Sequence, residues 1–375
     1  RAPSAPTARQ MSVLKRVGDR GVTLAWCPHN GADTRTYLAA ASKQGAGGGF
    51  DSYEGALEVY ALDAASSEAA PLELKGAAST DKKFECLAWS RFTAQSTYAA
   101  GIIAGGMTDG SISVWDPAAI VAAGSSSHGD ISVSPLANIV GKHRDTVTAL
   151  AFNPTAGMNH ILASGSADNT VLLFDLKAPG SGDVAHYAPA EGDVTGHAAP
   201  VTAVAWNQEV GHILATCARD GTTSVWDLRA KRPWCHLKDP SRSPCSALAW
   251  NPAGSGQVML MTASDDDARP CMRLWDLRKD TTRPMFELAA AQGRDGHSRG
   301  IVDLAWCPHD EAIIASTGKD KRTLFWDLYT CAVVDELDTS ELSGAGAGAG
   351  AVGGAGMGGA GIGIGGGGGG GGGGF

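Results

Sequence analysis

Three stretches of the chain repeat one combination of side chains that could do chemistry: a histidine, a hydroxyl residue and an aspartate, followed by an aromatic residue. The sets are His143, Ser164, Asp168 and Phe174; His197, Thr216, Asp220 and Trp226; and His297, Ser316, Asp320 and Trp326. In every set, 4 positions separate the hydroxyl residue from the aspartate, and 6 separate the aspartate from the aromatic residue. Histidine, hydroxyl and carboxylate together have the composition of a nucleophilic triad.

A catalytic set is needed only once, so three copies at the same spacing favour a structural role. In such a role the aspartate accepts hydrogen bonds from the histidine and from turn amides, and the network holds a loop against a sheet. We therefore predict that these residues form structural networks, that no residue is catalytic and that the chain is not an enzyme. We also expect no cofactor and no metal site.

The elements that would position these networks are short repeated strands. A triplet of two small or branched apolar residues and an aromatic residue recurs six times, and a second aromatic residue follows each copy, usually before Asp. Segments such as VTALAF (147–152) are apolar on both alternating faces, which is typical of strands buried between neighbouring sheets. Asp-Gly pairs such as Asp109-Gly110 supply tight turns. We find no helical periodicity between these strands.

Four-stranded units that recur every 40 to 60 residues and end in Trp-Asp are the signature of the WD repeat. The predicted fold class is therefore all-β, a WD-repeat β-propeller with six recognisable blades between residues 12 and 342. The predicted blades are residues 12–63, 84–117, 136–177, 193–233, 243–280 and 296–337. We expect residues 1–11 to be an extra, disordered N-terminal segment and residues 343–375 to be a disordered, low-complexity Gly/Ala tail.

The composition narrows the class of partner. The 375 residues carry 30 Lys and Arg against 39 Asp and Glu, for a net charge of −9. Nucleic acids and anionic membranes bind basic surfaces, so this balance argues against both as direct partners. No run of large apolar residues is long enough to predict a membrane span. The eight cysteines contain no C-x-x-C pair and are interpreted as reduced thiols.

The fifth unit departs from the pattern, because the acidic insertion SDDDARP (264–270) replaces its turn. Asp265, Asp266 and Asp267 could suggest calcium, but consecutive acids point in different directions along a turn. We predict a solvated loop that is a possible partner contact. Near the end of the fourth unit, Trp234 and Arg232 have the residue types of an interface hot spot. We favour packing under a loop for Trp234.

Several segments are more particular than a generic WD repeat: LAWCPHN (24–30), SYEGALEVYALD (52–63), TASDDD (262–267) and LAWCPHDEAIIASTGKDKRTLFWD (304–327). In order and wording, residues 13–340 resemble the N-terminal propeller of the large outer-cage subunit of the COPII vesicle coat, the SEC31 family. That family's propeller has seven blades, whereas six are recognisable here. The resemblance therefore implies that the last blade is missing from this sequence.

The resemblance implies a non-enzymatic scaffold for outer-cage assembly in transport from the endoplasmic reticulum to the Golgi. The implied partners are other coat propellers, a small propeller subunit of the SEC13 type, whose binding insert is absent here, and inner-coat subunits. The implied location is cytoplasmic, peripheral on endoplasmic reticulum exit sites and COPII vesicles through the coat alone. The alternative is a generic WD-repeat adaptor, such as a ubiquitin-ligase substrate receptor. An adaptor of that kind needs a basic or aromatic channel mouth, and we find no such basic cluster.

Overall fold

A computed structural model describes the repeated region of the chain. The described residues are 21–28, 35–43, 55–63, 72–93, 97–125, 133–179, 184–187, 197–252, 254, 256, 258–289 and 295–338. The predictions made for residues 1–11 and 343–375 lie outside these residues.

The described residues form six four-stranded antiparallel sheets, which we call blades 1 to 6 in chain order. Blades 1 to 3 comprise β1 (Val22–Trp26), β2 (Arg35–Ser42), β3 (Gly55–Asp63) and β4 (Glu73–Thr80); β5 (Phe84–Ser90), β6 (Ile102–Met107), β7 (Ile112–Trp115) and β8 (Ala137–Ile139); and β9 (Val147–Phe152), β10 (Ile161–Ser166), β11 (Val171–Asp175) and β12 (Ala185–Tyr187). Blades 4 to 6 comprise β13 (Val201–Trp206), β14 (Ile213–Ala218), β15 (Thr222–Asp227) and β16 (Arg232–Lys238); β17 (Cys245–Trp250), β18 (Met259–Ser264), β19 (Cys271–Asp276) and β20 (Phe286–Ala289); and β21 (Ile301–Trp306), β22 (Ile313–Gly318), β23 (Arg322–Asp327) and β24 (Ala332–Asp338).

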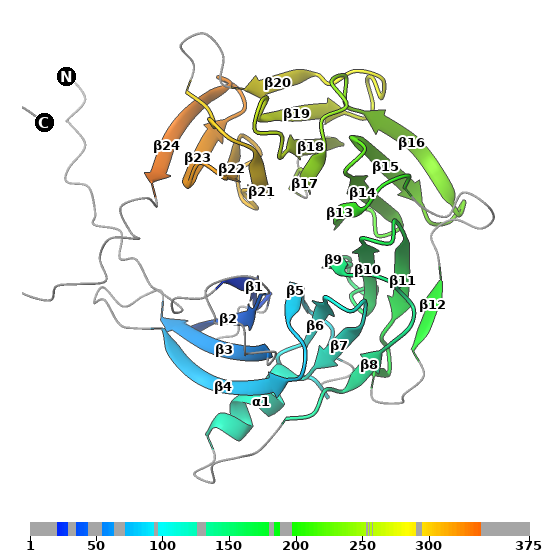
Figure 1. Cartoon of the computed structure of the whole chain (residues 1–375), viewed down its shortest axis with the longest axis vertical. Coiled ribbons are helices and arrows are strands. Elements are labelled where there is room, and N and C mark those ends of the chain that lie inside the picture. The colour runs from blue at the N-terminus through cyan, green and yellow to red at the C-terminus, as the bar shows by residue number, and fades with distance from the viewer. Residues whose placement is uncertain are drawn as a thin grey trace, which may run out of the picture. The chain divides into compact units, whose positions relative to one another are not determined.

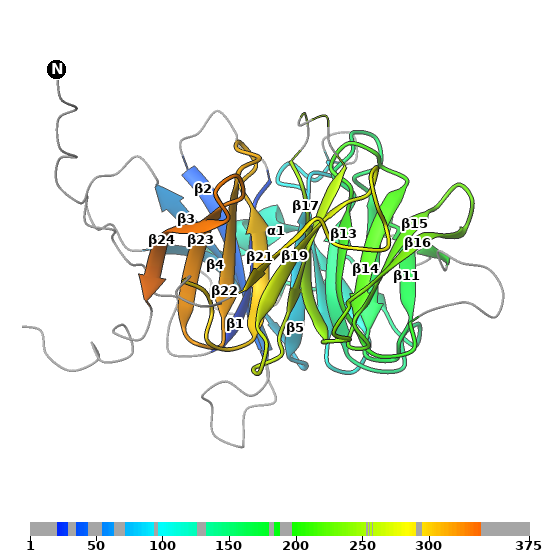
Figure 2. The same ribbon diagram turned by 90° about the horizontal axis from the view of Figure 1, so that it is seen from above.

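The blades are arranged around a centre, as Figure 1 shows. The first strand of each blade lies innermost, and each one packs against the first strand of the next blade from β1 to β21. The fourth strands lie on the outside. In the view of Figure 2 the strands run between the two faces of this ring of blades. The all-β propeller predicted from the repeats is confirmed.

Apolar contact between neighbouring blades holds the ring together. The middle strands β6 and β10 are buried at every position, as predicted for strands that are covered on both faces. Between blades 5 and 6, for example, Met261 and Leu274 pack with Ile314, Leu324 and Trp326. Burying a side chain of this size contributes roughly 1.5–3 kcal/mol. The stability of a blade therefore depends on its neighbours.

Figure 1 shows an opening between blades 1 and 6, and among the described residues these two blades lack the packing that joins the other neighbours. The opening exposes apolar side chains of β1, since Leu24 is 48% and Trp26 is 54% exposed. At the same repeat position in blades 4 and 5, Trp206 and Trp250 are 2% and 4% exposed. A neighbouring blade is what buries this aromatic position.

The structure differs from the sequence prediction in the outermost strands. In blades 1 to 5 the fourth strand lies partly or wholly beyond the predicted end of the blade, as β4 does beyond residue 63. These outer strands carry no aromatic triplet. In β16, for instance, most alternate positions are exposed, so the hydrophobic signal is weak.

The structure contains a helix in a segment where the sequence has no helical periodicity. Helix α1 (Pro117–Gly124) connects β7 to β8 and packs against β4 of blade 1. Asp116 caps its N-terminus by accepting a hydrogen bond from the Ala118 amide, and Pro117 occupies the first turn. The helix has almost no amphipathic pattern because its residues are nearly all small and apolar. Within the described residues, no helix has the length and apolar character that crossing a membrane requires.

Blade 2 has a core packed around a glycine. The rings of Phe84 and Trp115 lie 5.5 Å apart between their centroids, and Gly105 lies against both. A Cβ atom at Gly105 would be 2.5 Å from the Phe84 ring and 3.3 Å from the Trp115 ring. Val147 and Val201 hold the position of Phe84 in blades 3 and 4, five residues before the triplet aromatic. The large Phe84 is thus accommodated because residue 105 has no side chain.

We expect Gly105→Ala to lower the free energy of unfolding by about 1–3 kcal/mol through overpacking, measured by chemical denaturation. The variant Phe84→Val leaves a cavity and should also be destabilising. In the double variant the two changes should partly compensate, giving a favourable coupling energy in a double-mutant cycle. Strictly additive effects would show that Gly105 and Phe84 do not share this space.

Candidate functional site

The three predicted His–hydroxyl–Asp sets are each drawn together at one end of a blade. In blade 6, His297 Nε2 and Ser316 Oγ are 2.8 Å apart, and His297 Nδ1 lies 3.0 Å from Asp320 Oδ1. Trp326 Nε1 donates to Ser316 Oγ at 2.8 Å. The Ser298 amide donates to Asp320 Oδ2 at 2.9 Å. The network therefore ties the loop before β21 to the strands β22 and β23.

In blade 4 a threonine hydroxyl takes the place of the serine hydroxyl of blade 6. His197 Nε2 and Trp226 Nε1 each lie 2.8 Å from Thr216 Oγ1. Asp220 Oδ1 accepts from the Thr222 amide at 2.9 Å and so fixes the turn before β15. The hydroxyl oxygen is again the shared centre of the network.

Blade 3 carries a variant, because Phe174 has no N–H group to donate. His143 Nε2 lies 2.7 Å from Ser164 Oγ, and His143 Nδ1 lies 2.9 Å from Thr170 Oγ1. Asp168 Oδ2 is 3.4 Å from His143 Nδ1. The sequence predicts a direct hydrogen bond between the imidazole and the aspartate. In the structure, the Thr170 hydroxyl lies between these two groups.

The burial of the hydroxyl groups decides between chemistry and structure. Ser164 and Thr216 are 0% exposed and Ser316 is 1% exposed, so a substrate has no access to any of these three oxygens. Each hydroxyl oxygen is also engaged by an imidazole, and in blades 4 and 6 by an indole as well. The arrangement satisfies buried polar groups at these three positions.

Burial also determines the protonation of the histidines. It lowers the pKa of His197 to about 4, against a smaller upward pull from Asp220. Burial likewise lowers the pKa of His143, where Asp168 acts in the opposite direction. Burial alone would raise the pKa of Asp168, but hydrogen bonds from the Thr170 hydroxyl and from backbone amides lower it below its usual value. At neutral pH the imidazoles of these two networks are neutral.

These shifts predict a loss of stability in mild acid. In the unfolded chain His197 binds a proton near pH 6.5, whereas in the folded protein it does so only near pH 4. As pH falls from 6.5 towards 4 the unfolded state binds more protons, so the contribution of the neutral histidine to stability declines. The melting temperature should therefore fall by several degrees between pH 7.5 and pH 5. His197→Gln should melt lower at pH 7.5 and show a shallower dependence on pH, whereas an unchanged slope would contradict this assignment.

Blade 5 has an arginine network in place of the histidine network of blades 3, 4 and 6. Ser241 stands nine residues before the triplet Trp250, where blades 3, 4 and 6 carry their histidines. Arg273 Nη2 lies 3.5 Å from Ser241 Oγ, and Arg273 is 3% exposed. Its guanidinium pairs with Asp239, and its Nε donates to Glu287 Oε2 at 2.9 Å.

This ion-pair network is not among the features predicted from the sequence. Arg269, which belongs to the insertion SDDDARP, is an exposed residue that pairs with the other oxygen of Glu287 at 3.0 Å. A signal was available in the missing histidine of blade 5 together with an arginine two residues before Trp275, in a strand that is otherwise apolar. The partners Asp239 and Glu287 lie 34 and 14 residues away and could not be assigned without the fold.

Arg273→Met should be strongly destabilising, by about 3–5 kcal/mol, because it leaves Asp239 and Glu287 without their buried partner. The matched control is Arg269→Met, which removes an exposed arginine from the same glutamate and should cost no more than about 1 kcal/mol. Urea denaturation of the two variants measures the difference. Equal losses would mean that the buried pair contributes nothing specific.

The described residues of blade 2 form neither a histidine–hydroxyl network nor a buried arginine network. Gly105 stands ten residues before Trp115, where Thr216 and Ser316 precede their tryptophans. The Trp115 Nε1 atom is buried and has no hydrogen-bond partner among the described residues. Blade 2 therefore relies on the aromatic packing of Phe84 and Trp115 in place of a polar network.

The acidic insertion of blade 5 is bound to blade 6. Asp267 pairs with Arg299 at 3.0 Å and accepts from the Gly300 amide at 3.0 Å. The Asp265 carbonyl accepts from Lys319 Nζ at 2.7 Å, and Asp266 Oδ1 accepts from a backbone amide of its own turn. The described residues contain no cluster of acidic, His or Cys side chains that could hold a metal ion. These contacts give the loop a structural role, and its contact with a partner stays a prediction.

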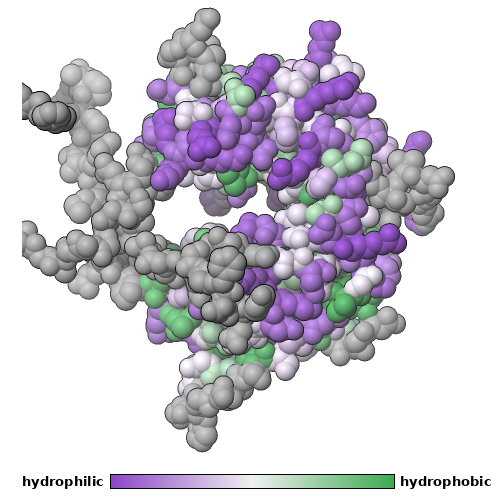
Figure 3. Space-filling model, in the orientation of Figure 1, coloured by the Kyte–Doolittle hydropathy of each residue, from purple (hydrophilic) through white to green (hydrophobic). Residues whose placement is uncertain are grey.

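Trp234 is not packed under a loop. It lies in β16 and is 55% exposed, on the rim of a cavity of about 320 Å³ between blades 4 and 5. The face of the ring seen in Figure 3 is mostly hydrophilic, with hydrophobic residues in small scattered groups. An exposed tryptophan beside a cavity has the character of an interface anchor rather than of a core residue.

Comparison with known proteins agrees with this geometry. The family description "WD domain, G-beta repeat" matches residues 134–175, 191–227 and 291–327. These three matches hold the three histidine networks. The chain is therefore a WD-repeat β-propeller.

Its relatives show to which family of WD-repeat proteins the chain belongs. Protein transport protein SEC31 of Dictyostelium discoideum is 32% identical over 332 residues, which is 88% of this chain and 23% of the relative. SEC31 homolog B of Arabidopsis thaliana is 33% identical over 328 residues, which is 87% of this chain and 27% of the relative. The chain is thus a SEC31 homologue that spans about a quarter of the length of these curated relatives.

A solved structure described as "COPII on membranes, outer coat vertex" has the same fold. Its TM-score to this chain is 0.65 at 26% identity, covering 85% of this chain and 76% of that one. A second, "The structure of the COPII coat assembled on membranes", gives the same TM-score and identity over 85% of this chain and 42% of that one. Sequence and fold comparisons point to the same group of proteins.

Proposed function

We propose that the chain is a non-enzymatic structural scaffold of the COPII vesicle coat, which acts in outer-cage assembly during transport from the endoplasmic reticulum to the Golgi. The observation that carries the proposal is similarity to SEC31 proteins over 88% of the chain, together with a shared fold with a protein of the COPII outer-coat vertex.

The physical design of the blades supports a passive role. The histidine networks and the Arg273 ion pairs tie loops to strands, which favours faces of fixed shape. A cage assembled from many weak contacts gains its strength from multivalency, provided that the geometry of each unit is fixed. The buried, repeated hydroxyl groups argue against catalysis at these sites.

The proposed partners are other coat propellers, a small propeller subunit of the SEC13 type and inner-coat subunits. The proposed location is cytoplasmic, peripheral on endoplasmic reticulum exit sites and on COPII vesicles through the coat. Eight free cysteines suit a reducing compartment. The net charge of −9 disfavours nucleic acid as a partner. The adaptor alternative has less support, because the relatives reported above carry the names of transport proteins.

Co-sedimentation with a reconstituted coat tests the proposal. The fluorescently labelled chain is added to liposomes carrying an inner and an outer COPII coat, to liposomes with the inner coat alone and to bare liposomes. We expect saturable binding that requires the coat, because a scaffold is recruited by protein contacts rather than by lipid. Equal binding to bare liposomes, or no binding while an authentic SEC31 propeller binds, would overturn the proposal.

A further inference from the structure

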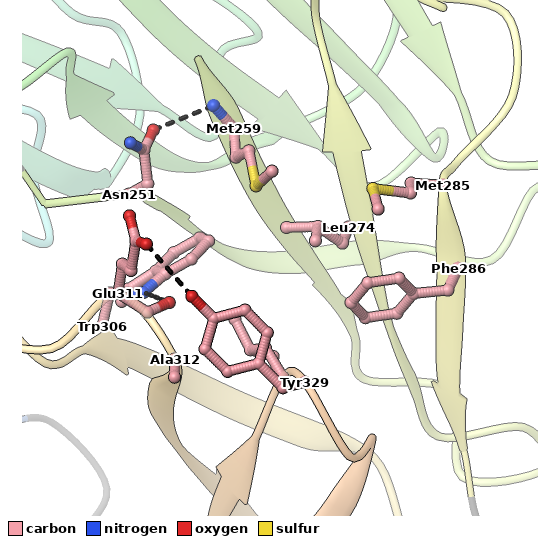
Figure 4. A pocket seen from close by; sticks show the side chains of 10 residues that line it. Asn251, Met259, Leu274, Met285, Phe286, Trp306, Glu311, Ala312 and Tyr329 are labelled. Carbon is pink, nitrogen blue, oxygen red and sulfur yellow. Dashed lines mark hydrogen bonds between the residues drawn. The ribbon is translucent and has the colours of Figure 1, made fainter. Parts of the chain in front are cut away.

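Two equivalent pockets lie side by side on the ring, one between blades 4 and 5 and one between blades 5 and 6. The second, which we call the acidic pocket, has a volume of about 90 Å³. Figure 4 shows its apolar wall, to which Met259, Leu274 and Phe286 contribute, and opposite it the side chains of Glu311 and Tyr329. The pocket therefore combines an apolar interior with a carboxylate at its mouth.

The Glu311 carboxylate is held in place by a hydrogen bond to one of its two oxygens. Tyr329 Oη donates to Glu311 Oε1 at 3.1 Å, and Trp306 Nε1 donates to the Glu311 carbonyl at 3.0 Å, as Figure 4 shows. Glu311 Oε2 has no hydrogen-bond or ion-pair partner among the described residues. Tyr329 is 77% exposed, so its ring is open to a partner.

The surroundings of the pocket are negative. The pKa of Tyr329 is raised, first by its hydrogen bond to Glu311 and then by the charges of Glu311, Asp310 and Asp327. No lysine or arginine lines this pocket within the described part of the chain. Glu311 is thus the carboxylate that lines the pocket beside an exposed aromatic ring, and no cation lines it among the described residues.

The neighbouring pocket between blades 4 and 5 is lined by residues of both charges, with Glu209 and Asp227 beside two arginines. Arg278 follows Trp275 by three residues, as Tyr329 follows Trp326, and Arg229 follows Trp226 in the same way. Both arginines line that larger pocket, where Arg229 pairs with Asp227 at 3.0 Å. The fold therefore supplies two similar pockets, and of these two only the one with Glu311 has a carboxylate and no arginine or lysine among the described residues that line it.

We propose that the acidic pocket binds an arginine side chain presented by a protein partner. The apolar stem of the arginine lies against Met259 and Leu274, and its guanidinium bonds to Glu311 Oε2 and stacks on Tyr329. Arginine fits better than lysine, because its planar group can engage a carboxylate and an aromatic face together. The inference rests on the proposed function, in which the propeller acts through contacts with other proteins.

The test uses a small probe and no coat component, so its outcome is independent of coat binding. The chain is labelled at the methionine methyl groups with ¹³C, and n-butylguanidinium is titrated in while NMR spectra are recorded. The signals of Met259 and Met285, which both line the pocket, are assigned with Met259→Leu and Met285→Leu. We expect saturable shifts at these two signals, and at least about fivefold weaker binding of the uncharged isostere n-butylurea, in the range of an exposed ion pair.

Glu311→Gln should weaken binding of n-butylguanidinium by about fivefold, because it removes the charge and keeps the shape. The matched control is Glu209→Gln in the pocket between blades 4 and 5, which should leave the shifts of Met259 and Met285 unchanged. Both glutamates are at least partly exposed, so the variants should fold, which an unchanged melting temperature would verify. Equal binding of n-butylurea, or equal affinity of Glu311→Gln and the parent chain, would overturn the proposal. Loss of coat binding with probe binding intact would count against the proposed function alone.

Discussion

The constraint on which the whole structure depends is that a single four-stranded sheet cannot cover both of its own faces. In blade 3, β10 is buried along its full length only because blades 2 and 4 lie on either side of it. The triplet aromatic shows the same dependence within one molecule. Trp206 and Trp250 are buried between blades, whereas Trp26, which faces the opening, is more than half exposed. Hydrophobic burial here is a property of pairs of blades and not of single blades.

Close packing of blades creates a second requirement, because polar groups enclosed at each junction need partners. Blades 4 and 6 meet it with an imidazole and an indole that share one hydroxyl oxygen. Blade 5 keeps a hydroxyl for its indole, since Trp275 donates to Thr262, but replaces the imidazole with a paired guanidinium. Blade 2 removes the hydroxyl and leaves Trp115 Nε1 unpaired beside Phe84. One architecture thus tolerates several local chemistries, provided that the space is filled.

The inner strands of the blades could be predicted from the sequence. The aromatic triplet occurs in all six units, and an aromatic residue followed by Asp occurs in most of them. The sequence was insufficient for the outer strands, which are short or exposed, as β12 and β16 illustrate. Helix α1 was missed because a run of alanine, isoleucine and valine has no amphipathic period. The sets centred on His197 and His297 could be recognised from spacing alone. The Arg273 network could not, because charges distant in sequence meet only once the sheets are formed.

The opening between blades 1 and 6 has a consequence for how the molecule comes apart. A closed circle gives every member two interfaces, but an open row gives the terminal members only one. Among the described residues, blades 2 to 5 have a neighbouring blade on both sides, whereas β1 and β21 each pack against the first strand of one other blade. Stability is then graded along the row, with fraying favoured at the two outer sheets and the greatest resistance to exchange in the middle. The side chains that meet solvent first when this happens are the ones that border the gap.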